Sequence, residues 1–437
     1  MTTTARSEAL FAEARGVMPS GYTRHLVVAK PHPLYAAYGE GCRIVDVDGT
    51  SRIDYVNNFT ALIHGHAKAE IIEIISTQAA RLLSAVLPTE WEVKLAQLLV
   101  DRIPGVEKVR FMNTGSEAVM LAVKAARAWT GRRKIAKMEG GYHGQFDLIE
   151  ASFQPRPDQW GDAARPTVVP HCVGTPQSLL DELVLLPTND IENTRARLRA
   201  EADQLAAVII DPFRIQMLMV EPRADYLAML REETARLGIV LIFDEVIALR
   251  TGYHGRQGHL GITPDLTTMG KIIGGGMPIG ALGGSNEVMS VFEVDDGDPK
   301  VKHSGTFTAN PLSMATGYVG MSLLTREAFD DLAAKGERLR AGLVRVLHDL
   351  KIPGRIEGTA SLTSFVLTDQ PITNYRELAT VTASGLGARM QAWQKLASGE
   401  GLLTMRGNFV GSTPMTEDDI DFTIEAVRRS LKQLQAA

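Results

Sequence analysis

Cysteine is scarce in this sequence of 437 residues, which contains only Cys42 and Cys172. Two cysteines are too few for a disulfide scaffold and suit a reducing compartment. Long hydrophobic runs are also lacking, since a run such as 239–243 is far shorter than the roughly 20 residues that span a bilayer. The first residues lack the apolar centre of a signal peptide. We therefore expect a cytoplasmic protein that is neither secreted nor embedded in a membrane.

An excess of either charge is lacking as well. Lys and Arg number 46 and Asp and Glu 51, which gives a net charge of −5, and no basic tract is present. A surface for nucleic acid or anionic membranes is therefore not expected. Apolar residues make up 45% and charged residues 22%, as in an ordinary globular chain. The length corresponds to two or three domains at roughly 100–200 residues each.

The middle of the chain repeats one theme, in which a short apolar run is followed by a polar or glycine-rich break and a helical stretch. Fully apolar strands that alternate with helices predict a parallel sheet covered on both faces, and ligands of such sheets collect at the carboxyl ends of the strands. After the first run we expect an Ala-rich helix over 117–130, closed by Gly131. The apolar runs are 106–111, 135–138, 206–210, 239–243 and 266–269.

The two ends of the chain have a different pattern. Residues 20–56 resemble short strands joined by turns, and after an acidic turn at 295–299 the chain becomes mainly helical. A strand is expected near 361–367, and Thr416 is the expected N-cap of the last helix. We infer a second, smaller α+β domain assembled from both termini. The expected division is 1–60 for its N-terminal part, 61–310 for the large domain and 311–437 for its C-terminal part.

Lys271 stands between the apolar run 266–269 and the glycines at 274–276. A lysine at a buried strand end shifts its pKa readily and forms Schiff bases with carbonyl compounds. The alternative is a solvated lysine at the rim of the sheet. A phosphate-loop motif is excluded, because Asp265 stands where that motif needs glycine. Gly274 to Gly280 is also a poor dinucleotide signature, because no strand–helix unit with a downstream acid follows it in the right register.

Two further strand ends carry residues suited to a phosphorylated, nitrogen-containing ring. Asp244 ends the run 239–243, where a carboxylate gains a charge-assisted bond to a protonated ring nitrogen, or simply caps a helix. Thr114, Gly115 and Ser116 lie between a strand and a helix, where backbone N–H groups and hydroxyls form an anion site. The alternative for this segment is a capping motif made by Ser116 with Glu117.

Tyr142 and His143 end another strand beside a glycine. An aromatic ring there can stack on a flat cofactor, or be a core aromatic at a turn. His64, His66 and His143 have no coherent ligand spacing with cysteines or carboxylates, so we expect no metal site.

Taken together and in this order, these features resemble the class III (subgroup II) pyridoxal-phosphate-dependent aminotransferases of fold type I. The resemblance covers about residues 15 to 430 and is nearest to the branch of glutamate-1-semialdehyde 2,1-aminomutase and the β-amino-acid aminotransferases. It implies an α/β fold with a mainly parallel seven-stranded sheet flanked by helices. The matching segments are Asn113-Thr114-Gly115-Ser116-Glu117-Ala118, Gly141-Tyr142-His143-Gly144, Phe243-Asp244-Glu245-Val246, Gly270-Lys271-Ile272-Ile273-Gly274-Gly275-Gly276 and Ser304-Gly305-Thr306-Phe307-Thr308-Ala309-Asn310-Pro311.

The resemblance also implies roles. Lys271 would bind pyridoxal 5'-phosphate covalently and then shuttle a proton, and Asp244 would keep the pyridine nitrogen protonated. Val246 and Tyr142 would pack on the two faces of the ring. Thr306 would bind the phosphate of the partner subunit's cofactor, which implies a homodimer with active sites at the interface. The implied cofactor-binding set is Thr114, Gly115, Ser116, Tyr142, His143, Asp244, Val246, Lys271 and Thr306.

Arg24 and Arg406 resemble the carboxylate-binding positions of the β-amino-acid aminotransferases, and the alternative for each is a surface ion pair. One departure concerns the family's usual Glu-Pro-x-Gln-Gly stretch, where this chain has Asp211 and Arg214 in a wall near the cofactor.

We expect an aminotransferase that moves an amino group from an amino acid, preferably a β-amino acid, to a keto acid such as pyruvate or 2-oxoglutarate. The alternatives are an aminomutase or racemase, and a non-catalytic regulatory protein. The presence of both Lys271 and Asp244 and the lack of a DNA-binding helix-turn-helix disfavour the regulatory protein.

Overall fold

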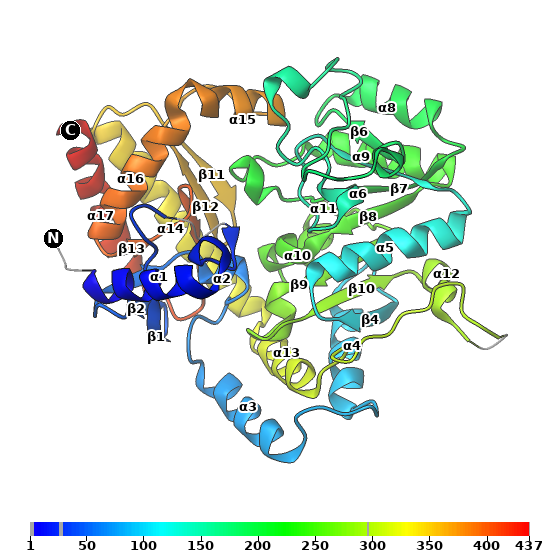
Figure 1. Cartoon of the computed structure of the whole chain (residues 1–437), viewed down its shortest axis with the longest axis horizontal. Coiled ribbons are helices and arrows are strands. Elements are labelled where there is room, and N and C mark those ends of the chain that lie inside the picture. Colours follow the sequence, from blue (N-terminus) through cyan, green and yellow to red (C-terminus); the bar gives the residue numbers. More distant parts are fainter. Residues whose placement is uncertain (1–3, 26–28, 295–296, 437) are drawn as a thin grey trace.

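The computed structural model describes residues 4–25, 29–294 and 297–436, so Asp295 and Asp296 of the expected acidic turn lie outside the described residues. Its larger part is built on a seven-stranded sheet with the order β4-β10-β9-β8-β7-β5-β6 (Figure 1). Only β10 runs antiparallel to its neighbours in this sheet. The fold class expected from the sequence is thereby confirmed. The strands are β4 (Lys108–Met112), β5 (Lys134–Met138), β6 (Leu183–Leu186), β7 (Leu205–Ile210), β8 (Val240–Asp244), β9 (Leu266–Gly270) and β10 (Gly280–Gly284).

Both faces of this sheet are buried under helices. Alternate residues of the same strands belong to two separate hydrophobic clusters, one beneath α5 (Gly115–Thr130) and one beneath α9 (Ala224–Leu237). Since successive side chains of a strand point to opposite faces, this alternation explains why a central strand such as β7 is apolar on both faces. The first cluster includes Ile135, Ala207 and Ile242, and the second includes Ala136, Val208 and Leu241.

Two strands of the sheet, β6 and β10, were not predicted. The glycine-rich sequence of β10 lacks the β-branched residues that mark a strand. Its glycines are needed because the backbone packs closely there: a Cβ on Gly280 would lie 2.0 Å from the carbonyl oxygen of Thr114. The glycines that prevent the prediction of β10 from the sequence therefore also allow the start of α5 to pack closely against the sheet.

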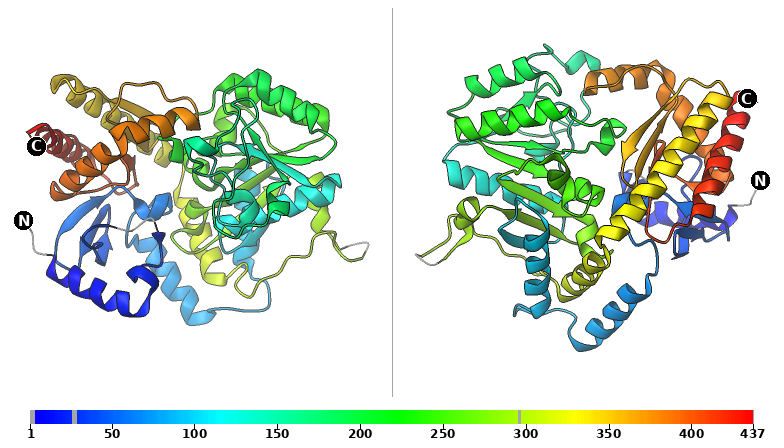
Figure 2. Two further views of the ribbon diagram at one scale, coloured as in Figure 1. Left: turned by 45° about the horizontal axis from the view of Figure 1, so that its top comes forward. Right: turned by 180° about the vertical axis from the view of Figure 1, so that it is seen from behind.

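The smaller part of the molecule combines both ends of the chain (Figures 1 and 2). One sheet has the order β1-β2-β3-β13, in which β13 pairs parallel with β3, and a second has the order β11-β12-β14. Ile53, Trp393 and Val427 share one hydrophobic cluster. The strands are β1 (Ala36–Glu40), β2 (Arg43–Asp46), β3 (Ser51–Asp54), β11 (Arg355–Thr359), β12 (Leu362–Val366), β13 (Leu402–Leu403) and β14 (Asn408–Val410).

Helices complete the two parts. Helix α13 (Pro311–Leu323) contacts α3, α4 and the turn that begins at Lys271, so the chain still packs on the larger part just after residue 310. The domain limits given above stay a prediction.

Among the described helices, none combines the length and the hydrophobicity that crossing a bilayer requires. The other helices are α1 (Ala5–Val17), α2 (Asn57–Thr60), α3 (Ala69–Arg81), α4 (Glu90–Arg102), α6 (Asp147–Glu150), α7 (Gln177–Leu180), α8 (Ile191–Ala200), α10 (Glu245–Ala248), α11 (Gly255–Leu260), α12 (Asn286–Met289), α14 (Arg326–Asp349), α15 (Tyr375–Val381), α16 (Gly387–Gly399) and α17 (Glu417–Ala436).

Candidate active site

The candidate site lies at the carboxyl ends of the parallel strands. Asp244 ends β8, Lys271 follows β9, and Tyr142 follows β5. Asp211 follows β7, which lies between β5 and β8 in the sheet. Thr114 follows β4, which runs in the same direction as these strands, because two antiparallel pairings at β10 separate it from β9. The parallel order therefore gathers the polar strand ends at one edge of the sheet.

The carboxylate of Asp244 is oriented from three directions. His143 Nδ1 lies 2.8 Å from its Oδ2, while the Thr268 hydroxyl (3.1 Å) and the Val246 N–H (3.2 Å) donate to its Oδ1. The last bond makes Asp244 the N-cap of α10, so the capping alternative is realised together with the wider network. His143 is buried against this carboxylate, and burial lowers the pKa of its imidazole. Such a network suits a carboxylate that must face a protonated ring nitrogen.

Lys271 has the properties of a reactive amine. Its backbone adopts φ +51°, a left-handed conformation that non-glycine residues rarely adopt and that is found at functional sites. Burial lowers the pKa of its ammonium to about 8, although Asp244 and Asp211 oppose the shift. Within residues 4–25, 29–294 and 297–436, no atom accepts a hydrogen bond from its Nζ, and no carboxylate forms a salt bridge with it. The amine is therefore available, and because Lys271 is partly buried it differs from a solvated lysine at the rim of the sheet.

The first turn of α5 offers donors for an anion. Thr114, rather than Ser116, caps this helix: the Glu117 N–H donates to the Thr114 hydroxyl at 3.1 Å, and the Glu117 side chain accepts from the Thr114 N–H at 3.1 Å. In the described part of the chain, the N–H groups of Gly115 and Ser116 have no acceptor. Two free N–H groups at the positive end of a helix of 16 residues form an anion site.

Glycines allow this anion site to approach the rest of the cluster. A Cβ on Gly115 would lie 3.0 Å from both methyl carbons of Val246, and one on Gly144, where φ is +101°, would lie 2.6 Å from the Ser116 hydroxyl. Tyr142 is half-buried, with its ring centroid 5.0 Å from that of Phe153. The predicted phosphate and ring-binding residues therefore lie together.

Asp211 and Arg214, the departure from the family pattern, line a small cavity together with Tyr142 and His143. Burial and the neighbouring carboxylate of Asp244 raise the pKa of Asp211 well above its usual value. The buried guanidinium of Arg214 donates to the Thr188 hydroxyl at 2.8 Å, and burial lowers its pKa to about 10. The two residues thus form a polar wall beside the predicted ring-binding side chains.

Three predicted residues are not joined to this cluster. Thr306 is exposed on a turn. Arg24 is exposed, and its Nη1 donates to the Asn58 side chain at 2.8 Å. Arg406 is exposed at a turn where φ is +52°. Among the described residues neither arginine forms an ion pair, so the surface-ion-pair alternative is not what the structure shows.

Sequence reasoning missed one residue of this site, Thr268, whose hydroxyl donates to Asp244. The neighbouring Glu245 is fully buried, and its carboxylate supports the fold by accepting from the N–H groups of Arg256 (2.7 Å) and Gln257 (3.0 Å). Thr268 had a signal: a hydroxyl inside a buried strand must find a partner, and parallel pairing puts it opposite Asp244.

Other histidines serve the fold rather than a ligand cluster. His64 Nε2 lies 2.8 Å from the carbonyl oxygen of Gly320, and His66 Nε2 lies 2.9 Å from a carboxylate oxygen of Asp54. Within the part of the chain that the structure describes, no three His, Cys, Asp or Glu side chains gather as a metal site would require.

Comparison with known proteins gives one consistent result. The family model described as "Aminotransferase class-III" matches residues 27–407. A crystal structure of an omega-transaminase from Sphaerobacter thermophilus has 45% sequence identity and a TM-score of 0.95, with 98% of each chain covered. A beta-phenylalanine aminotransferase from Variovorax paradoxus has 33% identity and a TM-score of 0.88, covering 99% of this chain and 95% of the other. A curated relative from Exiguobacterium sp., named glutamate-1-semialdehyde 2,1-aminomutase 2, is 36% identical over 98% of both chains.

Proposed function

The chain belongs to the class III aminotransferases, which are pyridoxal-phosphate enzymes, and from that premise we propose that its amino donor is a β-amino acid. The acceptor in this proposal is a keto acid such as pyruvate or 2-oxoglutarate. The observation that carries the proposal is the pair of arginines, Arg24 and Arg406, which form no ion pair in the described part of the chain. The similarity to a beta-phenylalanine aminotransferase supports the same donor class.

The residues present at the strand ends fit the cofactor. In the proposed arrangement, the free N–H groups of Gly115 and Ser116 bind the phosphate. Asp244, held by its three partners, keeps the ring nitrogen protonated. When bound, the cofactor supplies an electron sink for the carbanion that forms when the donor loses a proton. Lys271, with its pKa near 8, takes that proton and returns it as a general base and acid near neutral pH.

Arg24 is linked through Asn58 to a segment that reaches the loop after Lys271. Asn58, the partner of Arg24, belongs to α2, and Leu62 follows that helix within reach of Gly276: a Cβ on Gly276 would lie 3.2 Å from a Leu62 methyl carbon. The neighbouring Asn57 donates to the carbonyl oxygen of Val410 at 2.7 Å, four residues beyond Arg406. These contacts support a donor carboxylate bound on the side of the smaller part, where a guanidinium fork can bind both oxygens.

We also propose a homodimer in which Thr306 binds the phosphate of the partner subunit's cofactor. Phe307, next to Thr306, is 61% exposed, and Leu83, Val86 and Leu87 are 62%, 99% and 74% exposed. The two segments lie close together, since the Asn310 side chain donates to the carbonyl oxygen of Leu83 at 3.4 Å. Exposed apolar side chains on two neighbouring segments support an interface at this place. Light scattering of the purified protein should give twice the mass of 47.5 kDa.

The compartment remains a proposal as well. We propose the cytoplasm, because the chain holds no disulfide: Cys42 is a buried free thiol and Cys172 an exposed one. Fractionation of producing cells with an antibody against the chain tests this, and recovery with secreted proteins would contradict it.

The test of the donor is a panel of half-reactions. Holoenzyme is mixed with β-phenylalanine, with the matched α-amino acid and with a simple ω-amine, and loss of the visible band of the lysine-linked cofactor is followed. We expect the β-amino acid to convert the cofactor to its amino form fastest. Faster conversion by the α-amino acid or the amine would overturn the proposed donor class. Wild-type holoenzyme without any donor is the control for background loss of the band.

The second candidate, an aminomutase, is favoured by the curated relative of that name. Incubating holoenzyme with a donor and no keto acid separates the two functions. Transfer gives one keto product per active site and stops with the amino form of the cofactor, whereas an aminomutase converts the whole donor into an isomer.

A further inference from the structure

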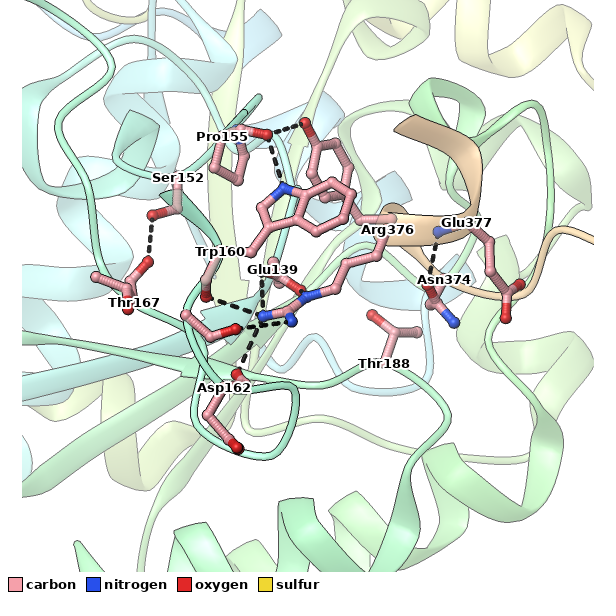
Figure 3. Close-up of polar contacts among 12 residues, drawn as sticks. Glu139, Ser152, Pro155, Trp160, Asp162, Thr167, Thr188, Asn374, Arg376 and Glu377 are labelled. Carbon is pink, nitrogen blue, oxygen red and sulfur yellow. Dashed lines mark hydrogen bonds and ion pairs between the residues drawn. The ribbon is translucent and has the colours of Figure 1, made fainter. Parts of the chain in front are cut away.

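Arg376, at the start of α15, forms hydrogen bonds to the larger part of the molecule through all of its guanidinium nitrogens (Figure 3). Its Nε and Nη2 donate to the two carboxylate oxygens of Glu139 at 2.9 and 3.0 Å. Nη2 and Nη1 also donate to the carbonyl oxygens of Trp160, Gly161 and Asp162 at 2.9–3.1 Å. The guanidinium carbon lies 5.4 Å from the centre of the Trp160 ring, within cation–π range.

Tyr375, the preceding residue, holds the same region. Its hydroxyl donates to the carbonyl oxygen of Pro155 at 2.8 Å, and the Trp160 indole N–H donates to the same oxygen at 2.9 Å. Its ring covers Gly140 so closely that a Cβ there would lie 2.2 Å from a ring carbon, and φ of Gly140 is +71°. The Asn374 side chain caps α15 by accepting from the Glu377 N–H at 3.0 Å. This cap stabilises the first turn of the helix, which carries Tyr375 and Arg376.

One of the contacted residues, Glu139, lies directly before the turn that carries Tyr142 and His143. Glu139 follows the last residue of β5, and Tyr142 and His143 come three and four residues later. Glu139 is 5% exposed, so without Arg376 its carboxylate would be a buried charge with no partner. Arg214 also contacts Glu139, since its Nη2 donates to the Glu139 carbonyl oxygen at 3.4 Å. Glu139 is therefore contacted by two arginines, Arg376 through its carboxylate and Arg214 through its carbonyl oxygen.

These contacts cross between the two parts of the molecule. Helix α15 belongs to the C-terminal segment, and in Figure 1 it reaches from the smaller part toward the loops of the larger one. Glu139 and Pro155 belong to the larger part, 237 and 220 residues away in sequence from their partners. Arg376 nevertheless contacts the carboxylate of Glu139, three residues before Tyr142.

We propose that Tyr375 and Arg376 form a clasp that positions the turn Gly140–Gly144, and with it Tyr142 and His143, against the cofactor. Arg376 is thus a positioning residue that acts through Glu139. The inference rests on the family's cofactor and not on the donor class proposed above. Opening the clasp lets the turn move, so that the ring loses its stacking partner and Asp244 loses the fixed position of His143.

The test measures cofactor release in the absence of any amino donor. Arg376→Gln and Arg376→Lys holoenzymes are diluted into a reagent that captures the released cofactor through its aldehyde group. The loss of the visible band is then followed over time. Amide hydrogen exchange of the peptide covering 138–146 is measured on the same holoenzymes. The matched control is Arg338→Gln, because Arg338 forms an equally bidentate pair with Asp421 at 2.9 and 2.7 Å, between α14 and α17.

We expect Arg376→Gln to release cofactor about 10-fold faster and to exchange faster across 138–146, with Arg376→Lys in between, since lysine keeps the charge but loses the fork. Arg338→Gln should leave both measurements at the wild-type values. A lower melting temperature for Arg376→Gln with unchanged release and exchange would show a merely structural contact and overturn the proposal.

If Arg376→Gln does not fold, Tyr375→Phe tests the same clasp by removing only the hydroxyl bonded to Pro155. We expect cofactor release about 2- to 3-fold faster, and wild-type release would contradict the clasp. Since no donor is present in these experiments, failure of the β-amino-acid proposal leaves their outcome unaffected.

Discussion

Two regions of the proposed site are built in different ways. Around Asp244 the side chains are buried, and both carboxylate oxygens have a partner within 3.2 Å. Around Arg24 and Arg406 the side chains are exposed, and one hydrogen bond to Asn58 holds the first of them. The buried region is pre-organised for one cofactor, whereas the exposed region leaves room for the choice of substrate. From this difference we infer that the cofactor chemistry and the proposed donor preference are separable, which the following predictions test.

The largest effect is expected from Lys271→Ala. Removing the amine eliminates both the covalent attachment of the cofactor and the proton carrier, so turnover should fall about 10⁴-fold or more. The visible band of the lysine-linked cofactor should disappear, while the circular dichroism of the protein stays that of the wild type. Turnover above 10% of the wild type would show that the reactive amine lies elsewhere.

Asp244→Asn comes next in size. The amide keeps the shape of the carboxylate and can still accept from Val246 and Thr268, but it carries no charge to hold a protonated ring nitrogen. We expect turnover to fall about 10²- to 10³-fold, as when one electrostatic partner of a reaction centre is removed. Spectra should show bound cofactor. A loss below about 3-fold would mean that this carboxylate does not serve the ring.

Arg406→Gln probes the exposed region. Losing charge-assisted bonds to the donor carboxylate should raise KM for a β-amino acid about 10- to 150-fold with little change in kcat, since that interaction is made in ground and transition states alike. Cofactor titration should give the wild-type affinity. Arg406→Lys keeps the charge without the fork and should lie between the two. An unchanged KM would assign the donor carboxylate to another residue.

The smallest effect is expected from Thr268→Val in the buried region. One of the three polar partners of Asp244 is removed at constant volume, so cofactor affinity should fall about 2- to 10-fold. Thr268→Ser keeps the hydroxyl and serves as its matched control. Affinities that are equal in both variants would show that the hydroxyl does not orient the carboxylate.

The same contrast explains what the sequence could predict. The apolar runs that form β7 and β8 predict a buried parallel sheet. The polar residues that follow these runs predict where the carboxyl ends of the strands lie. Lys271, Asp244 and the start of α5 were therefore found in the correct places in the fold. Their family roles came from the order of motifs, which composition and periodicity alone do not supply.

The partners of these residues could not be predicted in the same way. Thr268 is 24 residues from Asp244 and His143 is 101 residues away, so their hydrogen bonds depend on strand order, which local patterns do not determine. The glycine-rich strand β10 was not predicted, because close backbone packing and not strand propensity determines its position. The clasp at Arg376 joins segments more than 200 residues apart and has no local signal at all.

The most direct test of the separation is one experiment on the double variant Arg24→Ala/Arg406→Ala. Its holoenzyme and the wild type are titrated with pyridoxal 5'-phosphate and then mixed with β-phenylalanine while the visible band is recorded. The account predicts wild-type cofactor affinity and an intact initial band, with conversion by the donor slowed at least about 10²-fold. A double variant that loses its cofactor together with its donor reaction, or one that converts the donor at the wild-type rate, would contradict it.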